Sequence, residues 1–394
     1  MARRLAILVF ALLVALACGQ PQAGGSGQLV LGAIYPLSGP QAPGGKQELA
    51  GVEAALRVAH ANVRLQVIDA TTPQAASAAV DTLVRDYHVP LILGTYGSTL
   101  SAAASSRAEE LKTVYWETGA VADPITAHRH YVFRTVATGS SLGRMAVTFS
   151  HDVLVPDYKL TTPRAVVVRV NDIYGQSVGG GEQDLAQAMG INVVDLVEYN
   201  PNAYDANVIA ARVAQDHPDF LWDVSYLDDG VAIWDAVLSN HVPLKGAIGT
   251  SSAFCMPAFS RRVGPGSIGV YAADKPDSEI AAAALSPAGQ ALLAQAKAAY
   301  GGPMEIPAVA GFVGGWTLFR DVLPNAGGAL SAESIRVAAL KVDVAVGDSI
   351  NGGGVKFAGA DALDEGQNTR AAAVVGQWQA VGVMKVVYPP AYRD

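Results

Sequence analysis

The chain has 394 residues, of which 51% are hydrophobic and 16% are charged, and its formal net charge is -8. The composition is typical of a globular protein with a large core, and the length suffices for two lobes of ordinary domain size. The acidic balance argues against nucleic acid or an anionic membrane surface as a partner. Two cysteines imply no disulfide framework, and because metal-type cysteine clusters are absent we expect neither a metal nor a cofactor.

Residues 1–17 have the features of an export signal. Two arginines precede an entirely apolar run that is too short to span a bilayer. Small Ala17 stands directly before Cys18, which resembles a bacterial lipoprotein signal, in which the cysteine is lipidated and becomes the mature N-terminus. The alternative is ordinary secretion with cleavage nearby, in which Cys18 is not lipidated. Residues 18–27 predict a flexible tether.

The remaining chain alternates apolar strand patterns with amphipathic helix patterns. The predicted strands are 29–35, 64–69, 91–93, 114–116, 131–134, 165–170, 193–199, 220–224, 244–248 and 268–272, with a two-stranded return over 371–388. The predicted helices are 46–60, 72–87, one that ends at Leu111, 140–154, 182–189, 205–215, 231–239, 288–300, 308–323 and 332–340. This alternation predicts an α/β fold with parallel sheets.

Small polar loops follow two neighbouring strands, at 95–99 and 117–120. In parallel α/β sheets, ligands bind at the carboxyl ends of the strands. Ser98 and Thr99 would begin a helix, where free N–H groups favour an anion, although such residues commonly serve only as helix caps. A second copy of the pattern, with loops 225–230 and 249–252, predicts two similar sheets that face each other with a ligand between them.

Aromatic and acidic side chains fall on the same strand-exit loops. Tyr96, Tyr174 and Tyr226 could cover a ligand with their rings while the hydroxyl groups remain hydrogen-bonded. Asp228 lies in the second-lobe loop. It is either a solvent-exposed acid at a helix N-terminus, where a carboxylate is favourable, or a partner for a ligand cation.

Two further motifs match catalytic or nucleotide-binding patterns. Residues 175–179 fit G-x-S-x-G, but a nucleophile elbow places its serine on the turn that leaves the strand, and here 171–176 intervene. A Ser177 hydrolase is therefore the least favoured alternative. Residues 264–269 fit G-x-G-x-x-G but precede a predicted strand, so the dinucleotide-binding context fails.

Five stretches carry a family resemblance. They are IYPLSGP at 34–40, LILGTYGS at 91–98, PITAHRHYVFRT at 124–135, NDIYG at 171–175 and QWQAVGVMKVVYPP at 377–390. Together they resemble the type I periplasmic solute-binding proteins of the branched-chain amino acid (Leu/Ile/Val-binding) family, the binding components of ABC importers. The resemblance implies two Rossmann-like lobes joined by three crossover strands, with the ligand cleft between them. It places lobe 1 at 28–136 plus 270–340 and lobe 2 at 137–269 plus 341–394.

The resemblance also implies ligand contacts. Ser98, with Thr99 beside it, would hold an α-carboxylate, and the loop Thr118, Gly119 and Ala120 would hold both main-chain groups of an amino acid. Tyr174 would close over the ligand, and Tyr226 would supply a further aromatic ring.

Two positions depart from the family pattern. The acid that usually binds the α-ammonium falls near Ser251, where no carboxylate stands. Burying an ammonium without a counter-charge is costly, so either Asp228 substitutes or the ligand is not an α-amino acid. Gly44 stands where some relatives have an aromatic residue.

The resemblance thus leads to an expected function without catalysis. We expect an exported protein, lipid-anchored at Cys18 in the periplasm or on the outer face of the cytoplasmic membrane. It would bind a small amino acid, or a related carboxylate or amide, by hinge closure and deliver it to the membrane subunits of an ABC permease. We expect a monomer. A ligand sensor of the same fold that acts on a signalling partner is the alternative.

Overall fold

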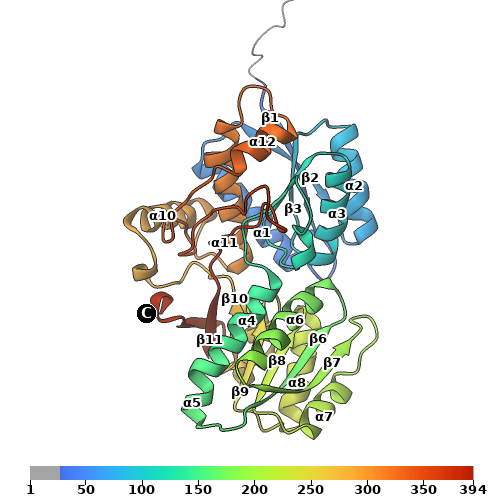
Figure 1. Cartoon of the computed structure of the whole chain (residues 1–394), viewed down its shortest axis with the longest axis vertical. Helices are drawn as coiled ribbons and strands as arrows, with labels where there is room; N and C mark the ends of the chain where they lie inside the picture. Colours follow the sequence, from blue (N-terminus) through green and yellow to red (C-terminus); the bar gives the residue numbers. More distant parts are fainter. Residues whose placement is uncertain (1–26, 394) are drawn as a thin grey trace, which may run out of the picture.

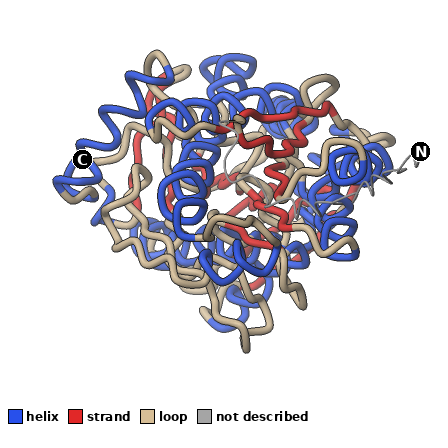
Figure 2. Tube along the Cα trace, turned by 90° about the horizontal axis from the view of Figure 1, so that it is seen from above, coloured by secondary structure: helices blue, strands red, loops and turns tan. Residues whose placement is uncertain are grey.

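The computed structural model describes residues 27–393, so the expected signal segment, Cys18 and nearly all of the tether lie outside the described residues. Two α/β lobes lie one above the other (Figure 1). Seen from above, strands lie inside and helices cover them (Figure 2). In this described part of the chain, no helix has the length and apolar character needed to cross a bilayer.

The first lobe contains a five-stranded parallel sheet of order β2-β1-β3-β4-β5. Its strands are β1 (Leu29–Tyr35), β2 (Val63–Asp69), β3 (Leu91–Gly94), β4 (Val114–Glu117) and β5 (Val132–Arg134). Its helices are α1 (Ala42–Val58), α2 (Pro73–Arg85), α3 (Ser98–Glu110), α10 (Pro287–Tyr300), α11 (Ile306–Trp316) with a π-helical turn (Thr317–Val322), and α12 (Ala332–Ala339). Trp116, Phe133 and Phe312 are fully buried in its core.

The second lobe contains a seven-stranded sheet of order β12-β11-β10-β9-β8-β6-β7, in which only the β10–β11 and β11–β12 pairs are antiparallel. Its strands are β6 (Arg164–Val170), β7 (Asn192–Tyr199), β8 (Phe220–Val224), β9 (Gly246–Thr250), β10 (Tyr271–Asp274), β11 (Val374–Ala380) and β12 (Val383–Tyr388). Its helices are α4 (Gly139–Phe149) with a π-helical turn (Ser150–Leu154), α5 (Val155–Tyr158), α6 (Ile173–Ala188), α7 (Ala206–Gln215), α8 (Leu227–Ser239) and α9 (Pro257–Val263).

The chain passes between the lobes three times: after β5, after β10 and before β11. The expected architecture of two Rossmann-like lobes with three crossovers is therefore confirmed. Two segments lie in the other lobe from the one expected. Strand β10 pairs with β9 in the second sheet, although 270–340 was expected in the first lobe. Val342, Val355 and Phe357 pack in the first-lobe core, although 341–394 was expected in the second.

The first and third crossing segments are fastened to each other by buried side chains. Arg134, with no exposed surface, donates from Nε to Oε1 of Gln367 at 2.6 Å and from Nη1 to the Ala122 carbonyl at 2.6 Å. Gln367 donates in turn to the Val136 carbonyl at 2.9 Å. Because these bonds tie the first crossing to the third, we refer to Arg134 and Gln367 as the hinge clamp.

The helix predicted over 182–189 begins earlier than expected, and most of the residues before it, 171–181, are not a loop. Helix α6 instead begins at Ile173, because Asp172 has an extended backbone and its Oδ1 accepts the Gly175 N–H at 2.9 Å. Four glycines lower the intrinsic helix propensity of this segment, but packing of α6 against α4 overrides it. Ser177 therefore lies inside a helix.

Candidate ligand site between the two lobes

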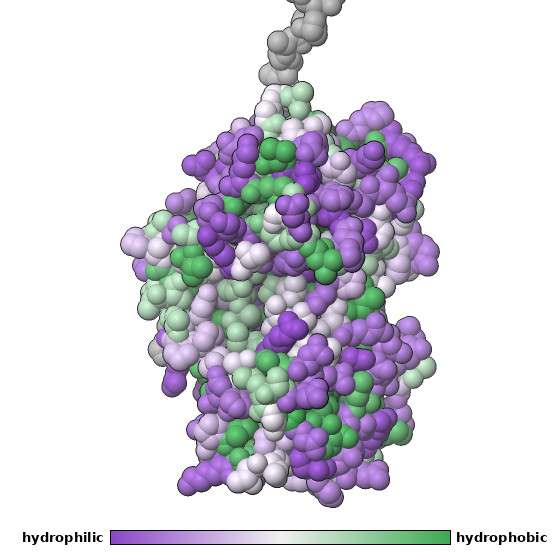
Figure 3. All heavy atoms as spheres, viewed as in Figure 1, coloured by the Kyte–Doolittle hydropathy of each residue, from purple (hydrophilic) through white to green (hydrophobic). Residues whose placement is uncertain are grey.

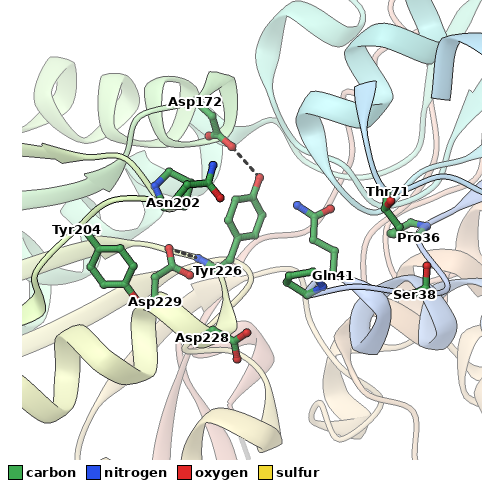
Figure 4. Close-up of a pocket in the computed structure, with 12 residues that line it drawn as sticks. Pro36, Ser38, Gln41, Thr71, Asp172, Asn202, Tyr204, Tyr226, Asp228 and Asp229 are labelled. Atoms are coloured by element: carbon green, nitrogen blue, oxygen red, sulfur yellow. Dashed lines mark hydrogen bonds between the residues drawn. The ribbon is translucent and has the colours of Figure 1, made fainter. Parts of the chain in front are cut away.

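The space-filling outline is indented between the lobes (Figure 3). Among the cavities lined by both lobes, two contain predicted site residues. The outer pocket, of about 420 Å³, is lined by Gln41 and Thr71 from the first lobe and by Tyr204, Tyr226 and Asp228 from the second (Figure 4). The deep cavity, of about 20 Å³, is lined by Glu48, Tyr96 and Gly119 from the first lobe and by Ser251 and Lys275 from the second. Its volume is enough for about one water molecule.

Tyr96 connects the two lobes. It follows β3, and its hydroxyl group lies 3.1 Å from Oγ of Ser252, which follows β9. Its ring lies against Gly44 on α1, where a Cβ atom would stand 2.2 Å from Cζ of the ring. Gly44 is the position at which the resemblance implies an aromatic residue in some relatives. The Tyr96 ring fills the space next to it instead.

Tyr174 and Tyr226 lie together in the second lobe, with ring centroids 5.2 Å apart. The hydroxyl group of Tyr174 donates to the Thr250 carbonyl at 2.6 Å. The hydroxyl group of Tyr226 donates to Oδ2 of Asp172 at 2.9 Å, as Figure 4 shows. Burial raises the pKa of both phenols, so both remain neutral donors. Thr99 of the first lobe also donates to Oδ2 of Asp172, at 3.4 Å, which adds a second contact across the cleft.

Ser98 is placed differently from the expectation. Its hydroxyl oxygen accepts the Ala122 N–H at 3.2 Å, and the residue is 3% exposed. It begins α3, as predicted, but its side chain connects two loops of the first lobe.

The donors of the loop at 118–120 are already occupied. Oε1 of Glu117 accepts the N–H groups of Gly119 and Ala120, each at 2.7 Å. Its Oε2 accepts the Thr95 N–H at 3.1 Å and the Ser101 hydroxyl. Burial raises the pKa of Glu117 to about 7, and these donors limit the rise because they stabilise the anion.

Glu48 on α1 is the second buried carboxylate of this region and has no exposed surface. Its Oε1 accepts the Thr118 hydroxyl at 2.5 Å, and that hydroxyl oxygen lies 2.8 Å from the Tyr35 hydroxyl group. Its Oε2 has no hydrogen-bond partner among the described residues. Burial, and then repulsion from Glu117, raise the pKa of Glu48 well above its ordinary value.

Glu48 and Glu117 were missed by the sequence-based reasoning. A signal for Glu48 was available, because it stands four residues before Val52 and therefore on the buried face of α1. Glu117 ends the strand whose exit loop was singled out, and a carboxylate there lies beside the backbone N–H groups of that loop, which no strand partner occupies.

Asp228 and Lys275, two further charged groups of the cleft, each form an ion pair within the protein. Asp228 is exposed, and its Oδ1 lies 2.6 Å from Nη1 of Arg262, so its charge is already compensated by the protein. Lys275, which is 7% exposed, places Nζ 2.9 Å from Oδ1 of Asp274. Ser251, where the family acid was expected, lies on the wall of the deep cavity.

Ser177 has a structural contact in place of a catalytic one. Its Oγ accepts the Asp123 N–H at 3.0 Å and so joins α6 to the first-lobe loop that precedes the hinge. Within residues 27–393, no three His, Cys, Asp or Glu side chains are grouped so that they could hold a metal ion.

A family model described as periplasmic binding protein matches residues 28–380. The chain belongs to this family. A relative of the binding protein, Leu/Ile/Val-binding protein homolog 8 of Brucella abortus, is 29% identical over 372 residues, which cover 91% of this chain and 90% of that protein.

Solved structures share the fold of the binding protein. A leucine-binding protein from Thermotoga maritima superposes with a TM-score of 0.78 at 18% identity, covering 91% of this chain and 98% of the other. A solute-binding protein of an ABC transporter from R. palustris, in complex with benzoate, has a TM-score of 0.75 at 19% identity and covers 93% and 99%. The fold is therefore that of the type I periplasmic binding proteins.

Proposed function

We propose that this protein is the extracytoplasmic binding component of an ABC importer, which captures a small solute between its lobes. The observation that supports the proposal is the hydrogen bond between Tyr96 and Ser252, because it joins a strand-exit loop of one lobe to a strand-exit loop of the other. Hinge closure around a ligand needs polar groups from both lobes to meet in this way.

The ligand would be a small amino acid or a related carboxylate or amide. The names of the relatives support this range, since one is a leucine-binding protein and another was solved with benzoate. The described deep cavity is smaller than any of these solutes. Binding therefore requires the lobes to separate and the Tyr96 ring to turn away from Gly44.

The proposal includes an anchor and a membrane partner. Lipidation at Cys18 would hold the protein at the outer face of the cytoplasmic membrane, and the closed lobes would be recognised by the permease subunits. Fractionation of cells that express the wild type and Cys18→Ala tests the anchor. The wild type is expected with the membranes and the variant with the soluble extracytoplasmic fraction. Recovery of both in the same fraction would contradict lipidation.

A thermal-shift screen of residues 27–394 against amino acids, deaminated acids and amides tests the binding function. A ligand at a hundred times its Kd should stabilise the folded state by about 2.7 kcal/mol. If no solute of these classes stabilised the protein, the proposed function would be wrong.

A further inference from the structure

The deep cavity contains one carboxylate oxygen that the protein leaves unused. Oε2 of Glu48 has no hydrogen-bond partner among the described residues, although the side chain is fully buried. It lies next to Gly119, where a Cβ atom would stand 1.8 Å from it. Both residues line the cavity. A buried acceptor without a donor costs free energy, so this oxygen is positioned for a group that the protein itself does not supply.

The donors that could have held an anion are consumed on the same side of the cleft. The N–H groups of Thr95, Gly119 and Ala120 all point to the carboxylate of Glu117. A ligand carboxylate would have to displace Glu117, whose own charge would then lie buried without these donors. The first lobe therefore offers an acceptor to the ligand, while its best anion-binding donors are already occupied.

The charges around the cavity also favour a cationic ligand group over an anionic one. Of the charged side chains that line it, Lys275 and Asp274 neutralise each other at 2.9 Å. Lys275 also lowers the pKa of Glu48, but its ammonium group is paired with Asp274, and no cationic side chain among the described residues forms an ion pair with Glu48. An ionised carboxylate in a buried site is stable only with a nearby cation, so a cationic group in the cavity would complete the charge balance.

We propose that Glu48 is the receptor for a positively charged nitrogen of the solute, and that solutes carrying only a carboxylate are rejected. The inference rests on the proposed function and narrows its ligand class to amines, amino acids and similar cations. An ammonium group has about the size of a water molecule, which suits a cavity of about 20 Å³. The role expected for a residue near Ser251 would thus be filled from α1 of the opposite lobe.

Binding of a cation would then be linked to a proton. Burial raises the pKa of Glu48, Glu117 raises it further, and Lys275 lowers it. Tyr35 and Tyr96, which also face Glu48, are neutral phenols with raised pKa values, and Asp274 is paired with Lys275. A cation that requires ionised Glu48 displaces its proton, so the affinity for the cation should rise with pH up to the pKa of Glu48.

Three solutes with the same aliphatic chain distinguish binding through the amine from binding through the carboxylate. L-leucine carries an amine and an acid, isoamylamine only the amine, and isocaproate only the acid. Calorimetric titration of the wild type should show binding of the two amines and none of isocaproate. In Glu48→Gln, which keeps an acceptor for Thr118, the affinity for the amines should fall about 10- to 100-fold. Glu53→Gln, an exposed substitution on the same helix, is the matched control and should leave the affinity unchanged.

A measurement on the wild type alone complements the variants. Titrations of isoamylamine at one pH, in two buffers with different ionisation enthalpies, should reveal release of a proton on binding. The inference is overturned if isocaproate binds as well as isoamylamine, or if amine affinity falls in Asp228→Asn but not in Glu48→Gln. In either case a solute is still bound and the proposed function stands. If none of the three, and no member of the wider screen, is bound, both fail together.

Discussion

The ring of Tyr96 lies against the α-carbon of Gly44, so closely that a single methyl group on Gly44 would stand 2.2 Å from Cζ of the ring. The Tyr96 ring therefore depends on glycine at position 44, because any side chain there would occupy the same space. With glycine at 44, the Tyr96 side chain fills the centre of the cleft.

Gly44→Ala is expected to destabilise the protein by about 1–3 kcal/mol, because the new methyl group and the ring cannot both fit. Urea denaturation measures the change. Gly180→Ala is the control, since it is also helical and a Cβ atom there meets nothing within 4 Å. That variant should gain about 0.4–1 kcal/mol. Equal effects in the two variants would contradict the close packing of Tyr96.

Tyr96→Phe is expected to favour the open arrangement of the lobes. The variant keeps the ring but loses the hydrogen bond to Ser252, which is worth about 0.5–1.5 kcal/mol. Small-angle scattering of the ligand-free protein should show a larger radius of gyration than in the wild type. Tyr87→Phe, at an exposed tyrosine, should leave it unchanged. An unaltered radius in Tyr96→Phe would mean that the contact does not hold the lobes together.

Stability is expected to fall as pH rises from about 4.5 to 8. Burial raises the pKa of Glu182 in the second lobe to about 8 from an ordinary value of 4.5, and that of Asp223 to about 8. Across this window the folded state keeps protons that the unfolded state has lost, so each group lowers the free energy of unfolding by up to about 1.4 kcal/mol per pH unit. Below the window both states are protonated and the full stability is present.

Glu182→Gln should make this pH dependence shallower, because one of the retained protons is removed. Urea titrations at several pH values between 5 and 8 measure the slope. Asp184→Asn changes an exposed acid on the same helix and should reproduce the wild-type slope. A slope that Glu182→Gln leaves unaltered would show that Glu182 is already ionised in the folded state.

Arg134→Lys is expected to destabilise the protein by about 1–3 kcal/mol, because a lysine cannot reproduce the three hydrogen bonds of the guanidinium group in the hinge clamp. Thermal and urea unfolding measure the loss. Arg144→Lys, at a half-exposed arginine 3.9 Å from Asp184, should change stability by less than about 0.5 kcal/mol. If both variants were equally stable, the guanidinium geometry of Arg134 would not matter.

The fold was largely predictable because apolar strands and amphipathic helices have simple periods. Helix α2, for example, begins after Thr72 as predicted, with the Thr72 hydroxyl oxygen accepting the Ala75 N–H. The start of α6 was not predictable from propensity, since tertiary packing overrode its glycines. The segment at 342–357 belongs to the first lobe through apolar contacts of a loop. A loop has no regular spacing of apolar residues, so the sequence does not indicate the lobe against which it packs.

The candidate site was predicted by loop position but not by charge. Tyr96, Gly119 and Ser251 do line the deep cavity, because strand-exit loops meet between the lobes. Glu48 was outside the prediction since it lies on a helix, and a helical acid is usually solvated. That Glu117 occupies the loop donors depends on a side-chain orientation that no pattern of residue types specifies.

The position of Glu117 bears on how the ligand specificity of this cleft could change in evolution. Its carboxylate accepts hydrogen bonds from the backbone N–H groups of Thr95, Gly119 and Ala120, which would otherwise form an anion-binding site. Replacing it by a small residue would empty that receptor without altering a strand or a helix. Cation and anion recognition in this scaffold would then be separated by one substitution, so a lineage could exchange one nutrient class for the other without rebuilding its binding site.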